Sequence, residues 1–305
     1  MLGRWWFAPA PAERLAALRI AIGGFALIWL VVWLPELLSI SQLPARDFAP
    51  VGITRVLRAP LPPAIVLAIF ALTVLALAAF TLGWRYRIAA PIAALGLLWT
   101  LTYRNAWSMV FHTENLLVLH VLALACAPAA DAWAADKPPD HAPPTGYGWA
   151  IKLLVALTCA TYLLAGIAKL RLGGLAWAGG EQLRNQIAID NLRKALLGSA
   201  VAPLARLSVA HPGALAGFAI GALAIELGAP LALFGGRIGR GWAWAAWSFH
   251  LGVVLTMNVW FPYPLSWVAL LPMVDADRLV RRATSPIATW VQNRRRRGMP
   301  RPENR

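Results

Sequence analysis

Long apolar runs, separated by prolines, glycines and short charged links, recur along the whole chain. One of them, Trp149–Leu170 (WAIKLLVALTCATYLLAGIAKL), is long enough to cross a bilayer as an α-helix, which rises about 1.5 Å per residue. A soluble domain carries about 25% charged residues, whereas this chain is 13% charged and 59% hydrophobic. Because lipid offers no water to the backbone, such runs are expected to fold as helices. The sequence therefore predicts an all-α, polytopic bundle of transmembrane helices.

Seven apolar runs are predicted to be membrane spans, and a shorter stretch follows them. Pro262 and Pro264 break the chain before that stretch, Leu265–Val274, which is either an eighth span or a re-entrant segment. We thus expect about eight spans, with seven and nine as the limits. A GxxxG pair in the sixth run, Gly217–Gly221, predicts a close helix contact. The seven runs are Leu15–Leu34, Ala64–Leu82, Ile88–Thr102, Asn115–Ala130, Trp149–Leu170, Gly213–Phe234 and Trp242–Asn258.

The net charge of +15 indicates topology and lipid contact, because the basic residues fall in the links between runs and at the C-terminus. We therefore expect membrane lipids as partners and no nucleic acid. With eight spans and the N-terminus in the cytoplasm, most Lys and Arg residues lie on the cytoplasmic side. The preference for Ala, Arg and Leu over Lys is typical of a GC-rich bacterial source. These features predict a multi-pass protein of a bacterial inner membrane with both termini in the cytoplasm.

Two regions are expected along the chain. Residues 1–280 form the transmembrane domain, and residues 281–305 form a basic cytoplasmic tail. The tail contains Arg294–Arg297 and is predicted to be disordered and to touch anionic headgroups.

The connection after the fifth run, Arg171–Pro212, is too patterned to be a simple loop. Leu183, Ile187 and Leu196 recur at helical spacing, with basic residues between them. This pattern predicts an amphipathic helix that either lies on the outer membrane interface or covers a cavity.

Ionisable and polar side chains interrupt the apolar runs. A charge at the centre of a span costs roughly 2.5–3.5 kcal/mol on the insertion scale. Each such group has a structural explanation: Lys169 can snorkel to the interface, Glu226 can pair with a basic residue, and a histidine can be hydrogen-bonded in the core. Their convergence on one polar cavity is the alternative that we favour. The groups are His112, Asn115, His120, Tyr162, Lys169, Glu226 and His250.

One element resembles a known family. Tyr162–Leu170 (YLLAGIAKL), followed by Trp177 and Gly180, resembles the signature of the horizontally transferred transmembrane (HTTM) domain. This domain is the membrane half of vitamin K-dependent gamma-glutamyl carboxylase and of its bacterial relatives. Phe111–Leu117 (FHTENLL) and the later Phe249-His250 are similar to other spans of that family, in the same order. The resemblance covers roughly residues 12–280.

The resemblance implies a chemistry. In the carboxylase, the lysine of this element deprotonates reduced vitamin K, so Lys169 is the candidate base and reduced vitamin K or menaquinol is the expected cofactor. His112 and Asn115 fall near the family's polar pair. We add Glu226 and His250 as candidate catalytic residues, with Tyr162, Trp177 and His120 as candidate cofactor-binding residues. No metal site is expected, because no Cys and His residues have ligand spacing.

Three functions remain open at this point. The first is a membrane enzyme that binds a (hydro)quinone and uses Lys169 as base. The second is a non-catalytic membrane module that binds lipid or a partner membrane protein, since the carboxylase's extramembrane portion has no counterpart in this sequence and protein carboxylation is not expected. The third, a transporter, ranks last because no inverted repeat or pair of broken helices stands out.

Overall fold

The computed structural model describes residues 2–107, 110, 112–136 and 146–279, and the predicted basic tail lies outside this part of the chain. All regular structure in the described residues is helical. The α-helices are α1 (Leu2–Trp6), α2 (Ala12–Val32), α3 (Leu34–Ile40), α4 (Pro63–Leu82), α5 (Tyr86–Arg104), α6 (Asn115–Ala125), α7 (Gly148–Gly173), α8 (Glu181–Leu196), α9 (Ala205–Ala210), α10 (Pro212–Leu227), α11 (Gly236–Met257) and α12 (Pro262–Leu265). The 3-10 helices are η1 (Ala45–Asp47), η2 (Gly52–Val56), η3 (Gly174–Gly179), η4 (Ala229–Phe234) and η5 (Val268–Met273).

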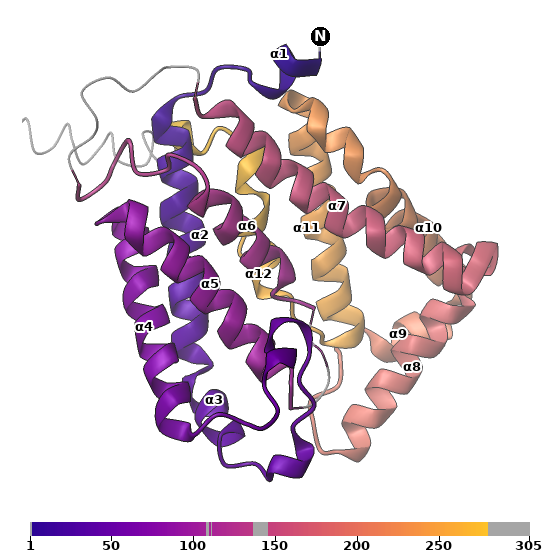
Figure 1. Ribbon diagram of the computed structural model, residues 1–305. Coiled ribbons are helices and arrows are strands. Elements are labelled where there is room, and N and C mark those ends of the chain that lie inside the picture. Colours follow the sequence, from indigo (N-terminus) through magenta and orange to yellow (C-terminus); the bar gives the residue numbers. More distant parts are fainter. Residues whose placement is uncertain (1, 108–109, 111, 137–145, 280–305) are drawn as a thin grey trace, which may run out of the picture.

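Two hydrophobic cores share helix α7. The first joins α2, α4, α5 and α6 to the first half of α7, and the second joins the next turns of α7 to η4, α11 and η5. In Figure 1, α2, α4 and α5 lie on one side of the bundle, α10 and α11 lie on the other, and α7 runs obliquely toward α10. The chain is thus a helical bundle in which one long helix contacts both halves.

Three segments of the described chain are long and apolar enough to cross a membrane: Ala12–Val32, Pro63–Leu82 and Gly148–Gly179. Helices α6 and α10 are apolar but shorter. The predicted fourth run therefore ends earlier than expected, at Ala125 rather than Ala130. The all-helical membrane fold is confirmed, while the number of crossings stays a prediction.

The predicted sixth run is wrong as one continuous helix. Helix α10 ends at Leu227, and the chain continues as η4 after Gly228. The physical reason is Pro230, which has no N–H and whose ring would clash with the carbonyl of Glu226 in an α-helix. Glu226 therefore lies in the last turn of α10, beside a break.

The last apolar stretch does not form a regular helix either. Its residues divide between α12 and η5, with Trp267 in the left-handed backbone region at φ 67°. Ala269, Leu270 and Met273 are buried by the rest of the bundle. Irregular backbone of this kind is tolerated in a membrane protein where protein surrounds it.

The predicted contact at the GxxxG pair is wrong. Beyond its own helix, a Cβ added at Gly217 or Gly221 would meet no atom of the described residues within 4 Å. Both glycines instead line the cavity described below. Their small size leaves open space on this face of α10.

The connection after α7 contains the expected helix, α8. Its Asn191 is buried and donates to the carbonyls of Ile187 at 2.8 Å and Thr256 at 3.0 Å. The same side chain accepts a hydrogen bond from the N–H of Ala202 at 2.7 Å. Asn191 therefore fastens α8 to the end of α11 and to the following loop.

Buried arginines are satisfied by the structure around them. Arg19 is fully buried, and its guanidinium donates to the carbonyls of Ala129 at 2.7 Å and Ala132 at 3.3 Å. Arg104 pairs with Glu36 at 2.8 Å and with Glu114 at 3.0 Å, just before α6. These contacts hold the loops that begin and end α6.

Candidate functional site

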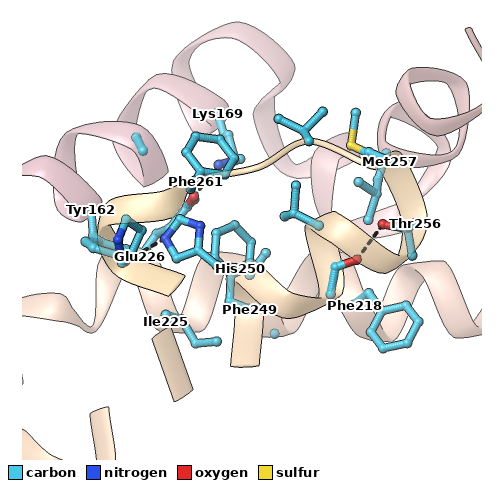
Figure 2. Close-up of a pocket in the computed structure, with 18 of the residues that line it drawn as sticks. Tyr162, Lys169, Phe218, Ile225, Glu226, Phe249, His250, Thr256, Met257 and Phe261 are labelled. Carbon is cyan, nitrogen blue, oxygen red and sulfur yellow. Dashed lines mark hydrogen bonds and ion pairs between the residues drawn. The ribbon is translucent and has the colours of Figure 1, made fainter. Parts of the chain in front are cut away.

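A cavity of about 700 Å³ lies between α7, α8, α10 and α11, and its wall is mostly apolar. The loop before α6 and the chain around α12 also contribute to it. In Figure 2, Tyr162, Lys169, Glu226, His250 and Phe261 gather at one end of the view, and Phe218, Thr256 and Met257 lie at the other. The cavity therefore has one end with several ionisable side chains and another end that is mostly apolar.

Lys169 and Glu226 form an ion pair at the polar end. The ammonium group of Lys169 donates to Oε1 of Glu226, and the two side chains come from α7 and α10. The Glu226 side chain is 3% exposed and that of Lys169 is 23% exposed. The second carboxylate oxygen of Glu226, Oε2, is buried and has no hydrogen-bond partner among the described residues. The snorkelling alternative for Lys169 is thus replaced by a pairing within the protein.

Gly166 explains why this pair can form. It lies one helical turn before Lys169 in the AGIAKL element, where α7 meets α10. A Cβ added there would lie 3.0 Å from Cβ of Glu226 and 3.0 Å from Cδ2 of Leu227. A residue without a side chain is therefore needed for α10 to approach α7 this closely.

Tyr162 and His250 make a second polar contact in the same wall. The Tyr162 hydroxyl lies 2.7 Å from Nε2 of His250, and both side chains are buried. When the hydroxyl donates to Nε2, the imidazole proton is on Nδ1. In the described part of the chain Nδ1 is buried and has no partner.

Trp177 closes the cavity beside Lys169. Its ring centroid lies 5.6 Å from Nζ of Lys169, within the range of a cation–π contact. Its indole N–H is buried and finds no acceptor among the residues described. Gly180 lies at φ 80°, and a Cβ there would come within 2.5 Å of the N of Ala216. The Trp and Gly that follow the AGIAKL element thus pack η3 against α10.

The remaining predicted residues lie in different environments. His112 is exposed and lines the cavity, whereas Asn115 is exposed and does not line it. His120 is fully buried outside the cavity wall, and its Nδ1 lies 2.6 Å from the hydroxyl of Tyr263. Tyr263 does line the cavity. Six of the eight predicted site residues therefore share the cavity, and His120 reaches it only through Tyr263.

Sequence reasoning did not include Tyr263 or the α8 residues Gln186 and Ile187 in the site. Tyr263 lies between Pro262 and Pro264, and this break in an apolar stretch was the available signal. For Ile187 the signal was the amphipathic pattern of the long connection, which predicted a helix on the outer interface or over a cavity, whereas nothing in the sequence indicated Gln186. The described residues contain no group of three or more His, Cys, Asp and Glu that could hold a metal ion.

Comparison with known proteins gives one result. A sequence model of the HTTM domain matches residues 7–272, which is most of the chain. The chain belongs to the HTTM domain family. The matched range includes every cavity residue, from His112 to Pro264. No curated protein sequence and no solved structure matches the chain.

Proposed function

We propose that this HTTM-domain protein binds a reduced quinone, such as menaquinol or reduced vitamin K, and that Lys169 is the base for its hydroxyl proton. One observation carries the proposal. The Lys169–Glu226 pair faces a mostly apolar cavity at the end where unpartnered polar atoms gather. The family resemblance of Tyr162–Leu170 adds the expected substrate class.

The shape of the cavity supports a ligand with a polar ring and an apolar tail. The polar end offers an acceptor on Glu226 and donors on His250 and Trp177. The opposite end, around Phe218 and Met257, offers apolar contacts to a tail. Burial of that tail contributes about 0.8 kcal/mol for each CH₂ group.

The residues of the polar end have separate roles in this proposal. Lys169 accepts the proton of the ligand hydroxyl, and Glu226 positions Lys169 through their ion pair. Tyr162 orients the imidazole of His250, whose free Nδ1 donates to a ligand oxygen. His112 lies at the rim, with Asn115 behind it as the family's second polar residue. The bound hydroquinone would supply an acidic hydroxyl and reducing power.

The second candidate function is a non-catalytic module that holds a lipid or a partner membrane protein. It is favoured by the apolar side chains that α8 exposes, since Ile189 is 66%, Leu192 61% and Leu196 78% exposed. Such a row suits contact with acyl chains or with another membrane protein. In that case the cavity would hold a lipid without reaction.

We also propose the membrane arrangement. The chain makes about eight passes through a bacterial inner membrane with both termini in the cytoplasm, and the α12–η5 segment serves as the last, broken pass. Helix α8 lies at the outer interface with its row of apolar residues toward lipid. Its opposite face, with Leu183 and Ile187, covers the cavity.

The function is tested by ligand binding and by proton transfer. The purified protein in detergent is titrated with menadiol under anaerobic conditions, and quenching of tryptophan fluorescence is measured. We expect saturable binding that is lost in Gly221→Leu, which fills open space in the cavity. Gly241→Ala, a position with open space in α11 that does not line the cavity, serves as control.

Lys169→Arg separates the two candidate functions. Arginine keeps the positive charge but does not give up its proton. A base at position 169 predicts that this variant binds menadiol and fails to ionise it, as followed by ultraviolet difference spectra. Ionisation equal to that of the wild type would exclude Lys169 as base and favour the lipid-binding module.

A further inference from the structure

We propose that Glu226 is a proton relay between the ligand hydroxyl and Lys169, with each carboxylate oxygen serving one partner. This inference rests on the proposed function and assigns a catalytic role within the same site. Lys169 holds Oε1, while Oε2 is buried and has no partner within the described residues. Glu226 itself lines the cavity. Because Oε2 has almost no accessible surface, the relay places the ligand O–H against this oxygen after a rotation of the carboxylate toward the cavity.

The burial of the two groups favours this order of contacts. Glu226 is 2% exposed, so an oxygen left without a partner is costly until a donor arrives. Lys169 is already engaged on one side by Glu226 and lies over Trp177 on another. A ligand O–H that reaches the carboxylate thus finds an acceptor without a partner, while the ammonium already has an acceptor.

In the proposed relay the pair reacts in its neutral form. The wall of the cavity is mostly apolar, and two charges in such surroundings lose their hydration. Moving one proton from Nζ to Oε1 gives an amine and a carboxyl group and removes both charges. In this form Lys169 has a free electron pair and can act as a base.

The transfer is balanced over three sites. The ligand O–H bond breaks, and its proton forms an O–H bond with Oε2. At the same time the Oε1–H bond breaks, and that proton forms an N–H bond with Nζ of Lys169. The carboxyl group is neutral before and after the step, Lys169 becomes an ammonium group, and the ligand becomes an oxyanion. Lys169 is thus the final base and Glu226 the group that touches the reacting oxygen.

His250 lies near the relay without taking part in it. Its Nε2 is engaged by Tyr162, and its Nδ1 has no partner in the described chain. It comes from α11, whereas Lys169 comes from α7 and Glu226 from α10. An Nδ1–H in this position donates to a ligand oxygen and stabilises the oxyanion or a second ring oxygen.

The test uses two probes in which a methyl group replaces the hydroxyl proton of the first. These are 1-naphthol, which is neutral in water at pH 7 and whose anion absorbs at longer wavelength than the neutral form, and its methyl ether, which has no donor. Wild-type protein should bind the naphthol about tenfold more tightly than the ether, because only the naphthol satisfies the buried Oε2. It should also bind the naphthol largely as the anion. This comparison needs no variant.

Two substitutions then test the roles of Glu226 and Lys169 separately. In Glu226→Gln the amide oxygen keeps Lys169, and the NH₂ group faces the cavity but cannot pass a proton on. This variant should bind the probes with little preference and ionise the naphthol about tenfold less. Lys169→Met should keep the preference for the naphthol and lose its ionisation. Glu181→Gln, an exposed carboxylate on α8 outside the cavity, is the matched control.

The outcomes separate the relay from the proposed function. Equal binding of the two probes by the wild type, or full ionisation by Glu226→Gln, would overturn the relay and leave Lys169 in direct contact with the hydroxyl. If the wild type bound neither probe nor menadiol, the relay and the proposed function would both fall.

Discussion

Single residues decide how closely the two helices of the site approach. Gly166 lies where α7 contacts α10, and an added methyl group would come within 3.0 Å of Glu226 and Leu227. Both neighbours belong to the last turn of α10 and would have to shift by a few tenths of an ångström to admit it. The position of Glu226 relative to Lys169 therefore depends on the absence of a side chain at Gly166, one helical turn before Lys169.

Gly166→Ala is expected to destabilise the protein and weaken the site. Forcing a methyl group into a packed contact costs about 1–3 kcal/mol, whereas alanine at an open helical position is neutral or favourable by about 0.5–1 kcal/mol. Gly241→Ala provides that comparison, since nothing lies within 4 Å of its added Cβ. Thermal unfolding in detergent measures the difference. Equal melting temperatures for the two variants would contradict the packing argument.

At the scale of elements, α8 holds its place through polar contacts with the end of α11. Lys194 donates to the carbonyls of Met257 and Asn258 and pairs with Asp190 at 2.7 Å. Burial raises the pKa of Asp190, but hydrogen bonds from Lys194 and Arg193 lower it by more, so that the pKa lies below its usual value. The charge of Asp190 thus supports the docking of α8.

This arrangement predicts that α8 loosens in acid. Because the pKa of Asp190 is lower in the folded state, its contribution is complete above the unfolded value of about 3.9. It is lost as the pH falls through the folded value. The protection factors of the α8 amides, which correct for the pH dependence of intrinsic exchange, should therefore fall below pH ~4 in the wild type. In Asp190→Asn exchange should already be faster at neutral pH, with a smaller acid-dependent change. Identical profiles for the two proteins would show that Asp190 has no such role.

At the scale of the whole molecule, the loops divide between two ends of the bundle. Residues 83–85 and 235–236 join helices at the end where α1 lies, and residues 41–62 lie at the opposite end (Figure 1). With the N-terminus in the cytoplasm, Arg237 should be cytoplasmic and Arg58 should face outward.

Labelling of single cysteines tests this arrangement. Arg58→Cys should react with a membrane-impermeant maleimide in intact cells, whereas Arg237→Cys should react only after the membrane is permeabilised. The reverse pattern would show that the topology is inverted. Labelling of both positions in intact cells would show that an even number of passes lies between them. The native cysteines are replaced by alanine beforehand, because Cys126 is exposed.

The sequence by itself determined the all-helical membrane fold, the approximate bounds of α2, α4 and α7, and the family. Length and apolar composition are local properties, and a lipid environment leaves few other structures for such runs. The AGIAKL element also indicated Lys169 as the candidate base from local sequence alone. The break at Pro230 was not predicted, because a proline inside an apolar run can kink a helix without ending it.

Only the tertiary structure decided which polar groups meet. Lys169 and Glu226 are separated by 57 residues, and Tyr162 and His250 by 88. No local pattern specifies such pairs, because they depend on how α7 crosses α10 and α11. The same packing left Asn115 outside the cavity and turned the Gly217–Gly221 pair toward open space. The chain thus carries its membrane fold in local composition, and its candidate chemistry in contacts that exist only once the helices have packed.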